Sequence, residues 1–269
     1  MTRPSQKQSG QKQSGFTLVE LAIVLMIIGL LIGGILRGQE LMENARVTST
    51  LQQITAYQGA KHTFQDAYDM LPGDIVTATA RVPGCTAVNA CINGNGDGII
   101  GILNPGQGAY ANEPWQSISN ALNTENTQFW KHLALAHLIS GINPSATQPD
   151  WGDSHPVAKI GGGFFMRYSN LSASSTIAQT SSHYLVLRMN ISGAWECDTA
   201  GQGSCAISPL RAAQMDRKAD DGIATTGDII AVSANWENGC GAANTGINGQ
   251  NGYAEGTENK TCDMMFKIP

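Results

Sequence analysis

Apolar residues dominate one stretch of the chain, from Phe16 to Leu36, and Glu20 is the only charged residue between Lys12 and Arg37. The stretch is about 21 residues long, close to the ~20 that a helix needs to cross a hydrocarbon core ~30 Å thick. A carboxylate inside such a helix is costly in lipid and usually functional. The pattern therefore predicts a membrane-inserted helix over residues 16–36, in which Glu20 has a specific partner.

The next part of the chain has an amphipathic helical period. Apolar residues recur every three or four positions, at Val47, Leu51, Ile54, Tyr57, Ala60, Phe64, Ala67 and Leu71. The opposite face has Gln52, Gln53, Lys61 and Asp66, and Pro72-Gly73 is a typical helix end. We expect a continuous helix from Phe16 to about Tyr68, whose second half packs one apolar stripe on a globular head.

The remaining apolar segments predict a mixture of helices and strands. Helices are expected over Thr124–Ser140, closed by Gly141, and over Ser208–Asp220, where Pro209 suits a first turn. Strands are expected over Gly163–Ser169, His183–Met189 and Gly227–Ala234, and residues 240–262 are rich in Gly and Asn, which is typical of a loop. The predicted fold is α+β, with a few antiparallel strands packed on the long helix.

Composition narrows the class of protein. The 269 residues suffice for one sizeable core, and a hydrophobic content of 42% excludes a disordered chain. The formal charge is −5, and it becomes about −8 without the three positive side chains of residues 1–15. This acidic balance argues against a nucleic-acid-binding surface, which needs a basic patch. Sparse charges with abundant Gly, Asn, Ser and Thr suit a loop-rich extracellular head.

The chain has six cysteines, all of them after the apolar stretch. An even number beyond a membrane segment indicates disulfides in an oxidising compartment, although the sequence leaves their connectivity open. Pairing of nearest neighbours is favoured because each pair flanks a Gly/Asn-rich loop: Cys85–Cys91, Cys197–Cys205 and Cys240–Cys262. The alternative is a zinc site, which the absence of any C-x-x-C spacing disfavours.

The residues before the apolar stretch determine how it is interpreted. Met1 to Gly15 contains Arg3, Lys7 and Lys12, no acid and no apolar stretch, so it lacks the h-region of a secretory signal and should stay cytoplasmic. A short basic leader, a Gly, and then Phe-Thr-Leu-Val-Glu resembles the type IV prepilin family, which includes the pseudopilins of type II secretion. The resemblance covers about residues 10–40. It implies that a prepilin peptidase cleaves between Gly15 and Phe16 and methylates the new amino terminus. Gly10 ends the first copy of a Gln-Lys-Gln-Ser-Gly repeat, but no apolar residue and acid follow it at the right spacing, which makes it a poorer candidate.

The resemblance also implies an organisation and a function. Residues 1–15 would be a cleaved leader, 16–72 a long helix whose part 16–36 spans the membrane and later forms the filament core, and 73–269 an extracytoplasmic head. The chain would be anchored in the bacterial inner membrane and then assemble with copies of itself into a helical, type IV pilus-like filament. An inner-membrane platform and a separate ATPase would drive assembly, since the sequence has no P-loop.

Two alternatives to a pilus subunit stay open. One is a pseudopilin in a short periplasmic filament, and the other is a minor pilin that carries an adhesin or another binding head at a filament tip. Arg37 stands where many major type IV pilins have a helix-kinking proline, which weakens assignment to that subclass. In any of these filaments, we expect Glu20 to pair with the free amino group of Phe16 on a neighbouring subunit.

Two acidic segments are candidate calcium sites. Residues 93–99 resemble the start of an EF-hand-type loop, with oxygen side chains at Asn93, Asn95 and Asp97 and glycines between them. The last position of that pattern is Asn104 instead of Glu, so a further acid such as Glu113 would be needed. The second candidate is Asp216, Asp220 and Asp221 at a helix end, where acids oppose the dipole and Arg217, Lys218 or a cation would compensate.

Catalysis has little support in the sequence. His132 and His137 are five residues apart, which is not the spacing of a metalloprotease helix, and no Gly-x-Ser-x-Gly occurs. Both histidines are expected to pack inside an apolar helix. The sequence therefore predicts a structural protein and not an enzyme.

Overall fold

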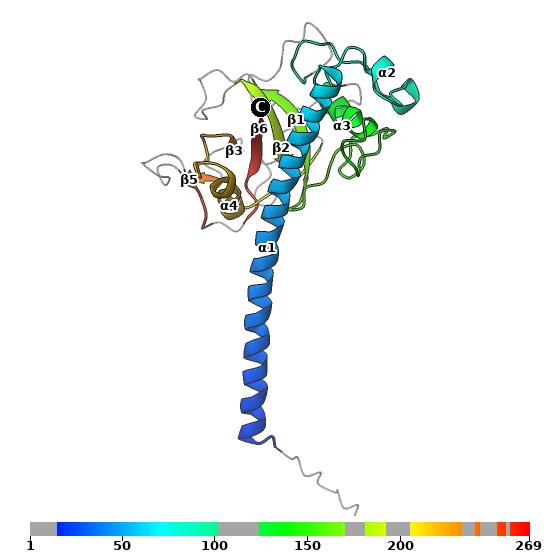
Figure 1. The fold of residues 1–269 in the computed structure, drawn as a ribbon. Helices are drawn as coiled ribbons and strands as arrows, with labels where there is room; N and C mark the ends of the chain where they lie inside the picture. Colours follow the sequence, from blue (N-terminus) through cyan, green and yellow to red (C-terminus); the bar gives the residue numbers. More distant parts are fainter. Residues whose placement is uncertain are drawn as a thin grey trace, which may run out of the picture. The chain divides into compact units, whose positions relative to one another are not determined.

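The computed structural model describes residues 15–101, 124–169, 181–191, 205–232, 240–242, 252–256 and 259–269. It contains two compact units, Met1–Asn44 and Ala45–Pro269. The boundary falls inside helix α1 (Leu18–Tyr68), the long helix at the start of the chain in Figure 1. The sequence analysis divided the chain after residue 72, whereas the structure groups the second half of α1 with the head because its apolar stripe is buried there.

Within the first unit, α1 is apolar on all sides over residues 18–36 apart from Glu20. Large side chains from Phe16 to Leu36 are all exposed, from 45% for Ile28 to 87% for Leu18. In the described part of the chain, α1 is the one helix that is long and apolar enough to cross a membrane, judged by length and composition. A helix without a polar face needs lipid or other helices around it.

The second unit is built on a four-stranded antiparallel sheet in the order β1-β2-β6-β3. Its strands are β1 (Gly163–Ser169), β2 (Ser182–Arg188), β6 (Asp263–Ile268) and β3 (Ile229–Val232). β6 pairs with β2 on one side and β3 on the other, with Met265 opposite both Val186 and Ile230. A smaller sheet joins β4 (Gly241–Ala242) to β5 (Gly252–Tyr253).

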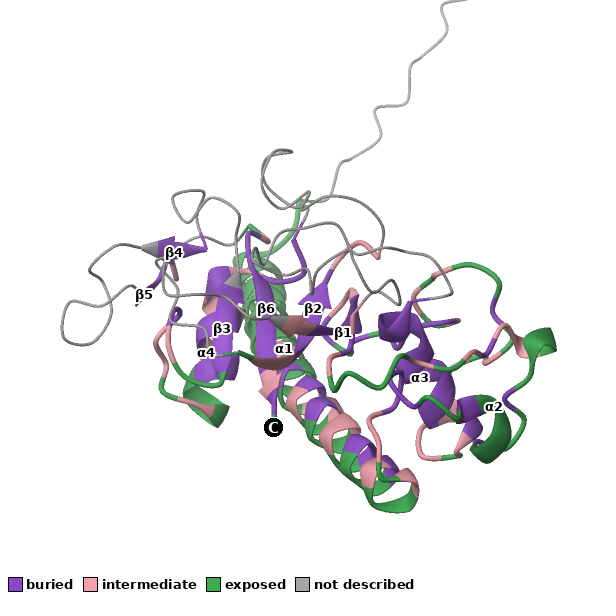
Figure 2. Ribbon diagram, turned by 90° about the horizontal axis from the view of Figure 1, so that it is seen from above, coloured by how far each residue is buried: buried purple, intermediate pink, exposed green. Residues whose placement is uncertain are grey.

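One face of the large sheet carries the main core. Residues of α1, α3 (Glu125–Leu135) and α4 (Pro209–Ala219) pack there against side chains such as Phe164, Leu185 and Phe266. The other face is also buried and holds Phe165, Tyr184, Val186, Ile230 and Met265, with Trp151 packed against them. Figure 2 shows the result: α3, β3 and β6 are almost entirely buried, whereas buried and exposed residues alternate along the second half of α1.

In the described part of the connection between α1 and α3, residues 69–101, there are two short elements. They are α2 (Ala78–Arg81) and the 3-10 helix η1 (Ala87–Asn89). α1 ends where Asp69 adopts a left-handed backbone with φ of 59°, three residues before the Pro72-Gly73 pair that the sequence suggested. The predicted α+β fold is therefore confirmed, and the long helix runs to Tyr68 as expected.

Three details of the sequence prediction were wrong. α3 ends at Leu135 and not at Ser140, because His137 has a left-handed backbone with φ of 58°. His137 is therefore exposed beyond the helix instead of packed inside it. Lys61, placed on the polar face of α1, is 3% exposed and donates a hydrogen bond to the carbonyl oxygen of Pro269.

The central strand β6 was not predicted. Its sequence, Asp-Met-Met-Phe-Lys-Ile, has no clear alternation of polar and apolar residues, because it is buried on both faces of the sheet. The other strands were placed well: β1 has the predicted bounds, β2 begins and ends one residue before its predicted bounds, and β3 begins two residues later than predicted, at Ile229.

Candidate functional site

The start of α1 is held by a reciprocal pair of hydrogen bonds between Thr17 and Glu20. The Glu20 carboxylate accepts from the backbone N–H and the hydroxyl of Thr17, both at 2.8 Å. The Glu20 N–H in turn donates to the Thr17 hydroxyl oxygen at 3.3 Å. This arrangement is a capping box, which satisfies helix N–H groups that have no partner one turn earlier. The sequence analysis missed it, although the Thr-x-x-Glu spacing was the signal.

Gly15 and Phe16 precede this box in non-helical backbone. Phe16 is 82% exposed, and a Cβ atom added at Gly15 would meet nothing within 4 Å. The fold of the chain therefore does not itself require glycine at this position, and the Gly15–Phe16 bond lies outside the helix, where an enzyme can reach it.

The predicted calcium loop in the head wraps around acids from elsewhere in the fold. The Asp74 carboxylate accepts the N–H groups of Gly96 at 2.6 Å, Asp97 at 3.2 Å and Gly98 at 2.9 Å. The Glu125 carboxylate accepts those of Asn95 and Gly101, both at 3.0 Å. The loop thus turns its backbone donors, more than its side chains, toward the two carboxylates.

Glycine makes this close approach possible. A Cβ atom at Gly94 would lie 2.3 to 2.4 Å from backbone atoms of Gly73 and Asp74, and Gly96 has a left-handed backbone with φ of 77°. Neither position accepts a larger residue without moving the loop. The Gly/Asn alternation that suggested a cation loop is therefore also needed for a loop that packs tightly on Asp74.

The structure keeps two of the three residues proposed as ligands together, because the Asn95 amide donates to the Asp97 carboxylate at 3.0 Å, but it turns the third away. Asn93 turns its side-chain oxygen to Thr79, accepting from its N–H at 2.9 Å. The side-chain oxygens of Asn95 and Asp97 accept N–H groups two residues further along the loop, and Glu113 lies outside the described residues. Asp97 instead joins Asp74 and Glu125: one oxygen of each carboxylate lies within 4.8 Å of the others.

The negative charges of these three carboxylates repel one another unless a proton or a cation is bound among them. Burial, together with the charges of Asp74 and Asp97, raises the pKa of Glu125 to about 7. Burial also raises the pKa of Asp74, against the effect of its N–H donors. Three carboxylates are chemically suited to a hard cation, although they provide only part of the six to eight oxygens that calcium takes.

The second acidic segment, at the end of α4, is engaged by its own turn. Asp216 is buried and accepts from the Tyr253 hydroxyl at 2.7 Å and the Gly222 N–H at 3.0 Å. Asp220 accepts from the Ile229 N–H, and Asp221 accepts from the Ile223 N–H and the Thr226 hydroxyl. Burial and the neighbouring acids raise the pKa of Asp216 to about 6.

The two basic residues expected to compensate these acids make their hydrogen bonds to other partners. Arg217 forms an ion pair with Glu255, and Lys218 donates to the Thr48 hydroxyl at 3.0 Å. The three acids accept instead from backbone N–H groups, the Tyr253 phenol and the Thr226 hydroxyl.

The structure has two of the favoured disulfides, Cys85–Cys91 and Cys240–Cys262. Cys205 is also disulfide-bonded, but Cys197 lies outside the described residues, so that pairing stays a prediction. His132 is near the first disulfide, and its ring accepts the Gly73 N–H at 2.9 Å and lies 3.1 Å from the Ile92 carbonyl oxygen. With both ring nitrogens engaged, His132 packs as the sequence analysis expected.

Comparison with known families gives one match, at the start of the chain. Residues 10–36 match the family model of the prokaryotic N-terminal methylation motif, the signature of type IV prepilins and pseudopilins. No match was found among curated proteins or among solved structures. Together with the apolar helix α1, the motif indicates a precursor of type IV pilin or pseudopilin type, anchored in the inner membrane before it assembles with other pilins.

Proposed function

We propose that this chain is a structural subunit of a type IV pilus-like filament, assembled through residues 16–36 after cleavage between Gly15 and Phe16. The observation that carries the proposal is the methylation motif, which lies directly on a helix whose apolar side chains are exposed on every side. Such a helix is stable in lipid before assembly and in a bundle of like helices afterwards. A platform in the inner membrane and a separate ATPase would drive the transfer of each subunit from the membrane into the filament.

The leader offers an internal control for the cleavage step. Gly10 and Gly15 end identical Gln-Lys-Gln-Ser-Gly copies, so Gly15→Leu and Gly10→Leu are the same change in the same local sequence. We expect intact-mass analysis of the wild-type surface form to show loss of residues 1–15 and one added methyl group. The Gly15→Leu chain should keep its leader, whereas the Gly10→Leu chain should mature normally. A wild-type surface form that retains residues 1–15 would refute the proposal.

Glu20 is proposed to pair with the Phe16 amino group of a neighbouring subunit. A lone carboxylate costs roughly 2.5–3.5 kcal/mol at the centre of a membrane helix on insertion scales, and less near its end. Cleavage after Gly15 creates the only nearby cation. The pair would neutralise both groups and fix the axial register between subunits.

The capping box allows this pairing to be tested separately from helix capping. Glu20→Gln keeps a capping-box residue but removes the charge, whereas Thr17→Val removes the hydroxyl and keeps the charge. We expect the Glu20→Gln and Glu20→Leu chains to be inserted and cleaved but to give few filaments, and Thr17→Val to assemble. Normal filament yield from Glu20→Gln would show that Glu20 acts only as a cap.

Electron microscopy of sheared surface fibres, with mass spectrometry of their subunits, distinguishes a pilus from the alternatives. A major subunit should dominate the fibres by mass. A pseudopilin would remain in the cell envelope, and a minor pilin at a tip would be present in trace amounts.

A further inference from the structure

A pocket of about 530 Å³ lies in the second unit, away from both acidic segments. Its walls come from three parts of the chain: residues 53–57 of α1, residues 138–141 after α3, and residues 152–159 before β1. The volume is within the range of sites that hold small molecules. The mixture of polar and apolar groups in the walls indicates what kind of molecule fits.

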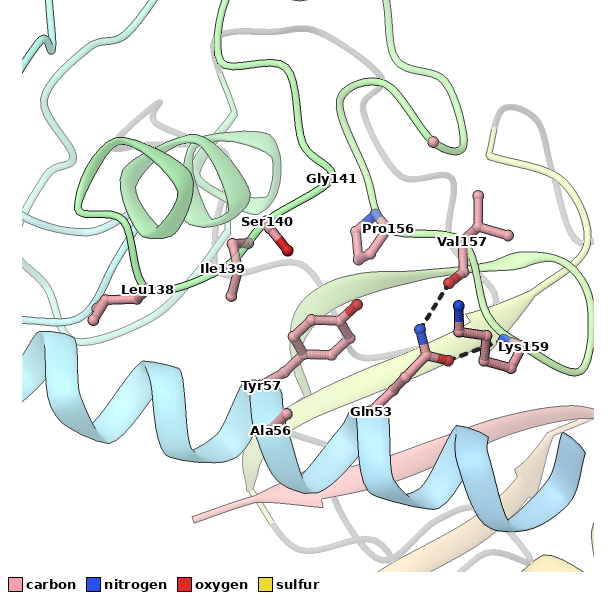
Figure 3. A pocket seen from close by; sticks show the side chains of 11 residues that line it. Gln53, Ala56, Tyr57, Leu138, Ile139, Ser140, Gly141, Pro156, Val157 and Lys159 are labelled. Carbon is pink, nitrogen blue, oxygen red and sulfur yellow. Dashed lines mark hydrogen bonds between the residues drawn. The ribbon is translucent and has the colours of Figure 1, made fainter. Parts of the chain in front are cut away.

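One wall is fixed to α1 by hydrogen bonds. The Gln53 side chain donates to the Val157 carbonyl oxygen at 3.1 Å and accepts from the backbone N–H of Lys159 at 2.9 Å (Figure 3). Both ends of the Gln53 amide are thereby engaged within the wall. The loop at 157–159 is therefore held in place, and this amide is already used by the fold.

The floor of the pocket is also ordered. The Tyr57 ring packs edge-on against Trp130 and Phe164, with ring centroids 5.1 and 5.8 Å apart. Because the pocket is preformed, little conformational entropy would be lost when a ligand binds in it.

The polar side chains that remain available in the pocket can all donate hydrogen bonds. Figure 3 shows the Tyr57 ring and the Ser140 hydroxyl directed into the space between the two loops. Burial raises the pKa of Tyr57, which keeps its phenol protonated. Lys159 lies across the pocket from Ser140, and no hydrogen bond or ion pair engages its ammonium group in the described part of the chain.

The charge of the lining has one sign. Among the described residues that line the pocket, Lys159 is the one charged side chain and none is an acid. Two acids of the same loop act on other groups: the Asp150 carboxylate accepts the Trp151 N–H at 2.8 Å. Burial lowers the pKa of Lys131, and the charge of Asp153 opposes that shift. In a chain with a net charge of −5, this lining favours an anionic ligand.

The rest of the wall is apolar and requires an apolar partner. Leu138 and Ile139 line one side, and Pro156 and Val157 line the other. An inorganic anion would leave these side chains without a contact. A neutral sugar fits poorly, because its hydroxyl groups need acceptors, and the described lining has no carboxylate and only the amide that the fold already uses.

We propose that this pocket binds a small organic acid, with its carboxylate at the Lys159 ammonium and its apolar body between Ile139 and Pro156. The Tyr57 and Ser140 hydroxyls donate to the oxygen atoms of the ligand. Charge-assisted hydrogen bonds of this kind are roughly twice as strong as neutral ones. This binding activity goes beyond the proposed filament function and does not depend on it.

The test uses the full chain in a neutral detergent, with 4-fluorobenzoate as the probe and fluorine NMR line broadening as the readout. We expect saturable broadening that unlabelled benzoate reverses. 4-Fluorobenzamide has the same ring without the negative charge, and it should bind about tenfold more weakly because it loses the charge-assisted contact.

Three variants locate the binding on the chain. Lys159→Gln removes the ammonium but keeps the backbone N–H that binds Gln53, and it should weaken benzoate binding about tenfold and leave benzamide binding unchanged. Lys218→Gln is the same change on α4, outside the pocket, and should bind as the wild type does. Ala56→Trp fills the pocket from an exposed position of α1 and should abolish binding of both probes. The melting temperature of each variant is compared with that of the wild type to confirm folding.

Four results would overturn the proposal. Equal affinity for the two probes, or wild-type benzoate affinity in Lys159→Gln, would show that the carboxylate does not bind at this ammonium. Broadening that survives Ala56→Trp in a folded chain would place the probe elsewhere. The absence of saturable benzoate binding by the wild-type chain would refute the site itself. The filament function would stand in each case, because maturation and fibre composition test it separately.

Discussion

Glu125 is the buried carboxyl whose ionisation should affect head stability most clearly, and Glu125→Gln is the perturbation that reveals it. The side chain is fully buried at the start of α3 and accepts the N–H groups of Asn95 and Gly101. Burial raises its pKa from 4.5 to about 7, and the charges of Asp74 and Asp97 act in the same direction. Glutamine keeps nearly the same shape and cannot ionise.

The sign of the pH effect follows from proton binding. Between about pH 4.5 and 7 the folded chain holds a proton on Glu125 that the unfolded chain has released. The free energy of unfolding therefore falls as pH rises through this window. A shift from 4.5 to about 7 corresponds to about 3 kcal/mol for the complete titration.

Other buried groups act in the same pH range. Burial lowers the pKa of His132 and of His183 to about 4, so these residues stabilise the folded chain as pH rises from about 4 to 6.5. Burial raises the pKa of Asp216 and of Asp263 to about 6, so these acids act in the same direction as Glu125. The wild-type profile is therefore a sum of opposing effects, and only the difference between variant and wild type isolates Glu125.

The assay is urea unfolding of the full chain in detergent, followed by tryptophan fluorescence from about pH 4.5 to 8. The free energy of unfolding of Glu125→Gln, minus that of the wild type, should increase by about 3 kcal/mol across this range. Asp66→Asn removes an exposed carboxylate of α1 and is the control for loss of charge. A difference for Glu125→Gln that is flat with pH, or that falls, would refute the reasoning.

Two further predictions concern the head. Millimolar calcium should raise the melting temperature of the head, because a cation bound only by the folded chain stabilises it. Asp97→Asn should remove this rise, whereas Asp221→Asn should leave it unchanged. The absence of any rise in the wild type would mean that both acidic segments are ordinary turns. Peptide mapping without reduction should find Cys85–Cys91, Cys197–Cys205 and Cys240–Cys262, and a Cys197–Cys262 peptide would contradict this pairing. From loop lengths set by separations of 6 and 22 residues, loss of the first disulfide should cost about 2 kcal/mol and loss of the third about 3 kcal/mol on a chain-entropy basis.

Local patterns predicted most of the fold. The period of α1, the apolar runs of β1 and β2, and Pro209 at the start of α4 are all signals carried by neighbouring residues, and each element lies where expected. β6 could not be found in this way, because a central strand buried on both faces has no alternation. Lys61 was misplaced because a single lysine in an amphipathic helix normally faces solvent, and its burial depends on a carbonyl group 208 residues away.

The candidate sites show the same contrast between local sequence signals and tertiary packing. Gly15, Phe16 and Glu20 belong to one short motif, so the sequence was sufficient to single them out. In the head, Asp97 was recognised within its loop, but Asp74 comes from the turn that follows α1 and Glu125 from the start of α3. Their approach depends on tertiary packing, and no spacing in the sequence indicates it.

The position of β6 in the sheet has a consequence for how the head folds. β1 and β2 can pair as a hairpin as soon as both have been synthesised. Among the described strands, β3 pairs only with β6, which comes after it in the chain. Until β6 arrives, β2 has one unpaired edge, and such edges recruit other chains. Pairings between distant segments also form slowly. Each newly exported subunit should therefore pass through an interval in which its half-built sheet is prone to aggregation through the open edge of β2.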